Sequence, residues 1–104
     1  VESCTQAAAQ LEAAGLEAAI VIDASHANSG KDPLRQPAVV RDVVARRQAG
    51  DRSLRGVMLE SNLVEGRQDS AGRSLDALVR GQSITDACLG FDDTAALLRE
   101  IAEA

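Results

Sequence analysis

Aromatic side chains are almost absent from this sequence. Phe91 is the only one among 104 residues, and Trp and Tyr are missing altogether. Small independent domains usually bury aromatic rings to gain core area. A core of Ala, Val, Leu and Ile therefore indicates layers of a larger assembly rather than a self-sufficient small domain. The chain also begins at Val1 instead of Met, so we expect further sequence ahead of it.

Cysteine is also scarce, with Cys4 and Cys88 as the only two. Two cysteines are too few for a disulfide scaffold, and their spacing matches no zinc-finger pattern. A reduced, cytoplasmic setting fits this usage best. Cys88 stands between Ala87 and Leu89, so we expect it to be buried by packing.

The sequence has no basic stripe and no long apolar run. Its formal net charge is -5, which argues against nucleic acids as partners and equally against anionic membrane surfaces. The longest apolar run, residues 18–22, is far too short to span a membrane, and no segment resembles a signal peptide. The apolar fraction of 45% and the charged fraction of 26% are those of an ordinary folded domain.

Hydrophobic patterning predicts two buried strands joined by a helix. Residues 18–22 run apolar without alternation, which is typical of a parallel strand covered on both faces, and residues 54–60 repeat the pattern. Residues 37–48 place four valines on one face of a helix. Two parallel strands with a helix between them form a βαβ unit, which crosses over right-handed. The four valines are Val39, Val40, Val43 and Val44.

The flanking segments complete the expected order helix, strand, helix, strand, loop, helix. An Ala-rich helix over residues 4–14 precedes the first strand, and a helix that Asp92 caps ends the chain. A loop is expected over residues 24–36, and a second over residues 61–81 with a short turn of helix after it, over 83–90. The fold class is therefore α/β, as one quarter of an eight-stranded barrel or one edge of a doubly wound sheet. The apolar face of the last helix is expected to comprise Thr94, Leu97, Leu98 and Ile101.

Polar side chains follow both predicted strands at their carboxyl ends. His26 follows the first strand, Glu60 ends the second, and Asp86 lies in a later loop that can fold back to join them. Neighbouring parallel strands lie about 4.8 Å apart, so these groups can converge. One imidazole and two carboxylates suit manganese, iron, cobalt or zinc. The alternative is a solvated cluster in which His26 is hydrogen-bonded to a loop.

A second, weaker motif is the stretch Asn28-Ser29-Gly30-Lys31. Its backbone can form a small nest for a phosphate group, to which Lys31 would add charge. The alternative is a polar loop with Lys31 in solvent.

Three blocks of sequence resemble the type I 3-deoxy-7-phosphoheptulonate (DAHP) synthases. They are residues 25–31 (SHANSGK), 56–66 (GVMLESNLVEG) and 81–90 (GQSITDACLG), in the order and near the spacing of that family. The resemblance continues through residues 92–94 into the last helix and so covers essentially the whole chain.

The resemblance implies a (β/α)8 TIM barrel that condenses phosphoenolpyruvate with erythrose 4-phosphate in aromatic amino-acid biosynthesis. In that family a Cys, a His, a Glu and an Asp hold one divalent metal ion, and the motifs match the last three to His26, Glu60 and Asp86. The family's Cys lies in an earlier block that this chain lacks, and neither Cys4 nor Cys88 matches it. The implied metal is a Lewis acid on the sugar aldehyde. His26 would also act in catalysis by orienting the nucleophilic water.

We therefore expect residues 1–104 to be the last two βα units of such a barrel, with no second domain. The chain alone would be inactive, whereas the complete enzyme would be a cytoplasmic homo-oligomer. His26 and Lys31 would contact its substrates. Two other interpretations are a small non-catalytic α/β module that binds a metal or phosphate, and a subunit that completes a barrel from a separate N-terminal chain.

Overall fold

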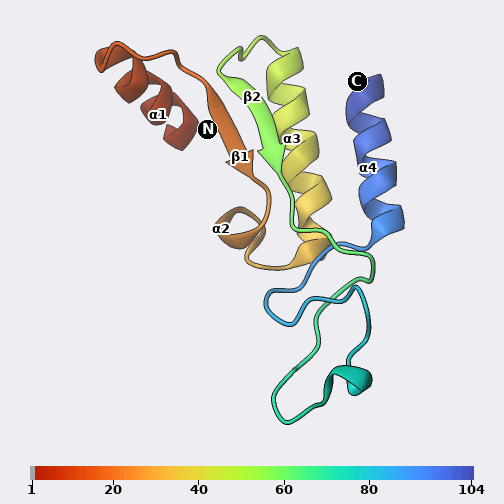
Figure 1. The fold of residues 1–104 in the computed structure, drawn as a ribbon. Coiled ribbons are helices and arrows are strands. Elements are labelled where there is room, and N and C mark those ends of the chain that lie inside the picture. The colour runs from red at the N-terminus through yellow and green to blue at the C-terminus, as the bar shows by residue number, and fades with distance from the viewer. Residues whose placement is uncertain (1) are drawn as a thin grey trace.

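The computed structural model describes residues 2–104, which form four α-helices and a two-stranded sheet (Figure 1). Two single turns of 3-10 helix interrupt the loops. The α/β class and the order of the main elements are confirmed. The elements are α1 (Glu2–Ala13), β1 (Ile20–Asp23), α2 (His26–Ser29), η1 (Pro33–Arg35), α3 (Gln36–Gln48), β2 (Leu54–Met58), η2 (Leu75–Ala77) and α4 (Phe91–Glu103).

The two strands pair in parallel, as their apolar runs predict. Ile22 lies opposite Val57 and Asp23 lies opposite Met58, with one irregularity near the start of β1. Helix α3 connects the strands and packs against β2. Because both strands run in the same direction, their carboxyl ends meet at one edge of the sheet, where the chain continues into α2 and into the segment after β2 (Figure 1).

The core lies between the sheet and the two long helices α3 and α4. One cluster of buried residues in it comprises Ala24, Val40, Leu89 and Leu97, which come from four different parts of the chain. The valine stripe predicted for α3 is confirmed, because Val40 and Val43 are buried while Val39 and Val44 pack partly buried against the core.

An ion pair between the outer surfaces of α3 and α4 reinforces this packing. Nε and Nη2 of Arg41 donate to the two carboxylate oxygens of Glu100 at 2.9 and 3.0 Å. The Arg41 guanidinium lowers the pKa of the Glu100 carboxyl below its usual value. Such a fork-to-fork contact fixes the orientation of α4 more than a single hydrogen bond would.

The expectation that the strands are covered on both faces is wrong for this chain. Val21 is 64% exposed and Met58 is 48% exposed. The reason is that α3 and α4 lie together on one side of β2 (Figure 1), and residues 2–104 provide no second layer for the other side of the sheet. The sheet therefore keeps an open apolar face.

Three local expectations are also wrong. The loop predicted over residues 24–36 contains α2 and η1, because local hydrogen bonds close short turns there. Residues 83–90 are not helical, since they form bridges with residues 61–67 instead. Asp92 does not cap the last helix, because α4 starts at Phe91 with Gly90 at the N-cap and Asp92 in its first turn. There its charge still favours the helix N-terminus.

The apolar face of α4 is narrower than its sequence indicates. Leu97 is 3% exposed, whereas Leu98 is 54% exposed, so the two adjacent leucines have different roles. None of the helices within residues 2–104 is both long enough and apolar enough to cross a membrane.

Replacing Leu97 with alanine is expected to destabilise the protein by about 2–5 kcal/mol, since it removes methyl groups from a buried site and leaves a cavity. Leu98→Ala on the same helix is the matched control and should change stability little. Chemical denaturation followed by circular dichroism measures both. Equal losses would contradict the packing of α4 described above.

Candidate metal centre

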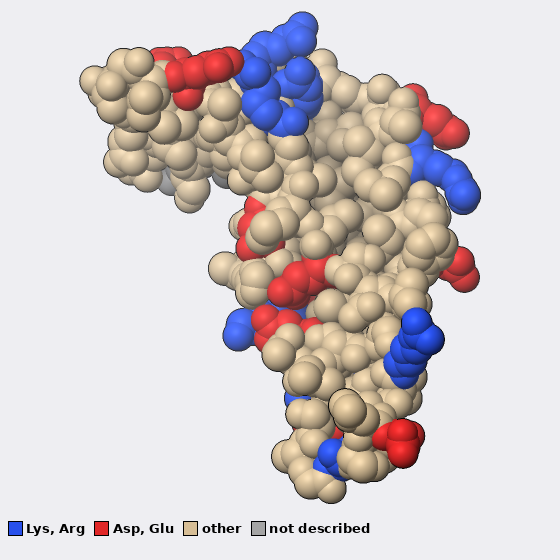
Figure 2. All heavy atoms as spheres, viewed as in Figure 1, with Lys and Arg blue, Asp and Glu red and all other residues tan. Residues whose placement is uncertain are grey.

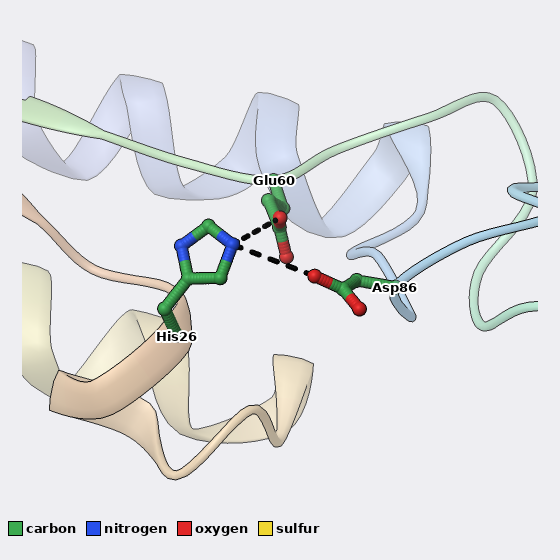
Figure 3. Close-up of side chains that lie close together, drawn as sticks. All are labelled: His26, Glu60 and Asp86. Carbon is green, nitrogen blue, oxygen red and sulfur yellow. Dashed lines mark ion pairs between the residues drawn. The ribbon is translucent and has the colours of Figure 1, made fainter.

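The three side chains singled out at the strand ends meet in the folded chain. Nε2 of His26 lies 3.1 Å from a carboxylate oxygen of Glu60 and 3.4 Å from one of Asp86. One potential ligand atom from each residue lies within 4.8 Å of the other two. Figure 3 shows the imidazole edge directed toward both carboxyl groups, and the three side chains come from three separate segments.

The separations from Nε2 of His26 to the two carboxylate oxygens fit donors that share a single ion. Nitrogen and oxygen ligands bind zinc at about 2.0–2.2 Å. Two donors at that distance from one ion lie about 2.8–3.6 Å apart when the angle between them is roughly 90–110°. One nitrogen and two oxygens also form the donor set that suits borderline divalent metals. The donor set and its spacing therefore fit a divalent cation.

His26 reaches the site from a strained backbone position. It opens the short helix α2 immediately after β1, and its φ of 45° is in the left-handed region. For a residue other than glycine this conformation costs of order 1–3 kcal/mol and persists only where neighbouring contacts hold it. The His26 carbonyl accepts from the backbone N–H of Lys31 at 2.7 Å, which closes the turn around it.

Asp23 is a functional candidate that the sequence did not single out. Its carboxylate accepts from Nδ1 of His26 at 2.7 Å, on the ring edge opposite the Glu60 and Asp86 contacts. The same carboxylate accepts from both the backbone N–H and the hydroxyl of Ser25. A carboxylate behind a ligating histidine fixes the tautomer, so that Nε2 is left free for a metal. The sequence feature that could have indicated Asp23 is its position three residues before the only histidine.

The same contacts shift the pKa values of both partners. Hydrogen bonds from Ser25, and next from His26, lower the pKa of Asp23. The hydrogen bond to Asp23, and next the charge of Glu60, raise the pKa of His26 above its ordinary value. Three carboxylates around one imidazole therefore favour a positive charge at this position, which a proton or a metal ion can supply.

Glu60 is held by a buried amide that sequence reasoning also missed. The Glu60 backbone N–H donates to Oε1 of Gln36 at 2.9 Å, and the Glu60 carbonyl accepts from Nε2 of Gln36 at 3.2 Å. Gln36 is only 1% exposed. The Glu60 carbonyl also accepts from the backbone N–H of Leu89 at 3.0 Å. No local pattern in the sequence predicts the pairing of Gln36 with Glu60, which stand 24 positions apart.

Asp86 is brought back to the sheet edge by backbone pairing. Gly66 and Cys88 exchange two backbone hydrogen bonds of 2.9 and 3.2 Å. On the other side of Asp86, Nε of Arg67 donates to the carbonyl of Thr85 at 2.8 Å. The residues flanking Asp86 are thus tied to the segment that follows Glu60, so the expectation that this loop folds back is confirmed.

The other candidate residues take no direct part in this cluster. Cys88 is buried, as expected, and burial raises the pKa of its thiol. Cys4 borders one hollow together with residues 51–53 and another together with Ile22 and Asn28, and it is not among the grouped potential ligands. Lys31 is exposed and has a φ of 63°, directly after α2.

Figure 2 shows acidic side chains gathered in the concave middle part of the molecule, separate from the arginine-rich upper end. Three carboxylates of the described chain, those of Asp23, Glu60 and Asp86, all contact His26. A cluster of carboxylates around an imidazole attracts cations.

Comparison with known proteins gives one consistent result. The chain is 49% identical over 94 residues to the Phe-sensitive phospho-2-dehydro-3-deoxyheptonate aldolase of Escherichia coli, which covers 90% of this chain and 26% of the relative. The Tyr-sensitive protein of the same organism is 48% identical over 92 residues, or 88% of this chain and 26% of the relative. This chain thus spans about a quarter of the length of these curated relatives.

The solved structure of phospho-2-dehydro-3-deoxyheptonate aldolase from Francisella tularensis superposes with a TM-score of 0.88 at 37% identity. It covers 98% of this chain, which corresponds to 29% of that protein. The sequence profile of the DAHP synthetase I family matches residues 1–99. With a matching profile over nearly its whole length, this chain belongs to the DAHP synthetase I family.

Proposed function

We propose that this chain supplies the metal-binding carboxyl-terminal part of an enzyme that condenses phosphoenolpyruvate with erythrose 4-phosphate to 3-deoxy-D-arabino-heptulosonate 7-phosphate and phosphate. The observation that carries this proposal is the convergence of His26, Glu60 and Asp86 within 4.8 Å. The relatives named above are aldolases of phospho-2-dehydro-3-deoxyheptonate, the same sugar acid.

The architecture proposed for residues 1–104 is the last two βα units of a (β/α)8 barrel, without a separate second domain. Parallel pairing of β1 and β2 supports it, as does the position of the cluster at their carboxyl ends, where barrel enzymes carry their active sites. The open apolar face around Val21 and Met58 supports it as well, because further strands and side chains of a barrel would cover that face.

His26, Glu60 and Asp86 would hold a divalent ion, with manganese, iron, cobalt and zinc all compatible with the donor set. Such an ion would supply Lewis acidity toward the aldehyde oxygen of the sugar phosphate. Asp23 would keep the proton on Nδ1 of His26, so that Nε2 would face the site as a lone pair. The fourth ligand of the family, a cysteine, would come from a part of the enzyme outside residues 1–104.

We propose that His26 also orients the reacting water and that Lys31 contributes charge toward a substrate phosphate from the turn after α2. Lys31 is exposed and thus free to reach a ligand. The remaining phosphate contacts would belong to the other strands of the barrel. The complete enzyme is proposed to be a cytoplasmic homo-oligomer.

The test is a turnover assay on the complete gene product with added Mn²⁺, phosphoenolpyruvate and erythrose 4-phosphate. We expect one phosphate released for each seven-carbon sugar acid formed, and loss of turnover when a chelator removes the metal. Residues 1–104 expressed alone should show no turnover, because three ligands and an open sheet do not form a closed active site. A metal-loaded complete product that releases no phosphate from this pair of substrates would contradict the proposal.

A further inference from the structure

Gln36 stands out as the largest buried polar side chain of the described chain that contacts a candidate ligand. We propose that Gln36 is a positioning residue, which holds the backbone of Glu60 so that the Glu60 carboxylate faces the divalent ion. This inference rests on the proposed function and extends it to a residue that never touches the metal.

The side-chain amide of Gln36 pairs with the backbone of Glu60 in the way that a neighbouring strand would. One amide group accepts from the N–H and donates to the carbonyl of the same residue, at 2.9 and 3.2 Å. Strand β2 ends at Met58, so Glu60 lies two residues beyond the sheet ladder. Without Gln36, the Glu60 N–H would lose its hydrogen-bond partner at the position where the ligand must be fixed.

Burial of the Gln36 amide is unfavourable unless both its oxygen and its nitrogen are hydrogen-bonded. Gln36 is 1% exposed, and an amide moved from water to such a place destabilises the fold when its polar atoms are left unpaired. Both of its polar atoms bond to Glu60. An apolar residue would fill the same volume without this cost, so packing alone does not explain a glutamine here.

The position of Gln36 in the chain links two of the ligands. Gln36 is the first residue of α3, and its backbone N–H donates to the carbonyl of Pro33. The same segment, residues 26–36, begins with His26. The loop that delivers the imidazole thus also carries the amide that places the Glu60 carboxylate, so their separation of 3.1 Å is set within one compact unit.

Gln36→Met tests this role because methionine has a similar length and volume but makes neither hydrogen bond. In the complete gene product, we expect Mn²⁺ affinity to fall about 10–100-fold, which is the range for residues that orient metal ligands. Substituting Co²⁺ adds a spectroscopic readout. Its visible absorption bands should shift in the variant, because a displaced Glu60 oxygen changes the ligand geometry.

Val40→Ala is the matched control. Val40 is also 1% exposed and lies on the same helix, but its side chain packs in the apolar core and has no polar group that could hydrogen-bond to Glu60. It should lower the thermal stability of the protein while leaving Mn²⁺ affinity and the Co²⁺ spectrum unchanged, when both are measured well below the unfolding temperature.

The outcomes separate this inference from the proposed function. Weakened Mn²⁺ binding with a shifted Co²⁺ spectrum in Gln36→Met, and neither in Val40→Ala, would support the role of Gln36. Unmodified protein that binds Mn²⁺, together with a Gln36→Met variant of equal affinity and identical spectrum, would overturn that role alone. Unmodified protein that binds neither ion would overturn the metal site itself and the role of Gln36 with it.

Discussion

Replacing His26 with alanine is expected to weaken Mn²⁺ binding by the complete gene product at least about 100-fold, the upper end of the loss found for residues that only orient ligands. His26 is the central member of the cluster, because its Nε2 lies within 3.4 Å of both carboxylates. Without the imidazole, Glu60 and Asp86 would face each other with no positive partner between them. Their mutual repulsion would push them apart and toward solvent.

Isothermal titration with Mn²⁺ measures this loss directly, and turnover should fall with it at a fixed metal concentration. Lys31→Ala is the control, since the Lys31 side chain is exposed and is not a candidate ligand, and alanine keeps the backbone N–H that donates to the His26 carbonyl. It should leave Mn²⁺ affinity unchanged. A raised KM for a phosphorylated substrate in that variant would support the proposed role of Lys31. Unaltered Mn²⁺ affinity in His26→Ala would contradict the proposed metal centre.

The three candidate ligands were predictable because the physics of parallel strands is local and regular. Apolar runs indicate where each strand lies, and their carboxyl ends must share one edge of the sheet. His26 and Glu60 follow those ends, so their meeting needs no knowledge of the remaining chain. Asp86 was harder, since its position depends on backbone pairing between Gly66 and Cys88, which leaves no periodic signal in the sequence.

The supporting residues were not predictable for a different reason. Gln36 begins a helix and precedes a proline, so in sequence it is typical of an exposed polar position, yet it is buried against Glu60. Leu98 shows the converse, since helical spacing favours burial but the structure leaves it 54% exposed. In both cases the burial of the side chain depends on what lies next to it in the folded chain. For Gln36 this neighbour is Glu60 after β2, and for Leu98 it is the open space beside α4. A local sequence pattern indicates neither.

Metal binding should also depend on Asp23, which holds His26 from the ring edge opposite the candidate ligands. Asp23→Asn keeps an oxygen in place but removes the charge that accepts the Nδ1 proton, and the amide can also turn its NH₂ toward the ring. We expect Mn²⁺ affinity at high pH to fall about 10–100-fold. Asp32→Asn is the matched control, because the Asp32 carboxylate lies in the same loop but accepts from the backbone N–H of Leu34.

The pH dependence of binding gives this prediction a second readout. In the metal-free protein the hydrogen bond that Nδ1 of His26 donates to Asp23 is the largest cause that raises the pKa of His26, so Asp23→Asn should lower that pKa. A protonated ring cannot bind a metal, so affinity declines as pH falls through the pKa. The decline should therefore begin at a lower pH in the variant, and the difference in affinity between the two proteins should shrink as pH falls.

Mn²⁺ titrations across a pH series, together with NMR titration of the His26 ring in metal-free protein, measure both effects, with His26→Ala to assign the resonance. If Asp23 acts only as a strand-end surface charge, Asp23→Asn and Asp32→Asn will behave alike in both experiments. If it orients the imidazole, as the 2.7 Å contact indicates, only Asp23→Asn will weaken binding and move the titration of His26 to lower pH. The position of that proton decides whether the histidine can be a ligand at all, since Nε2 must be unprotonated to bind a metal.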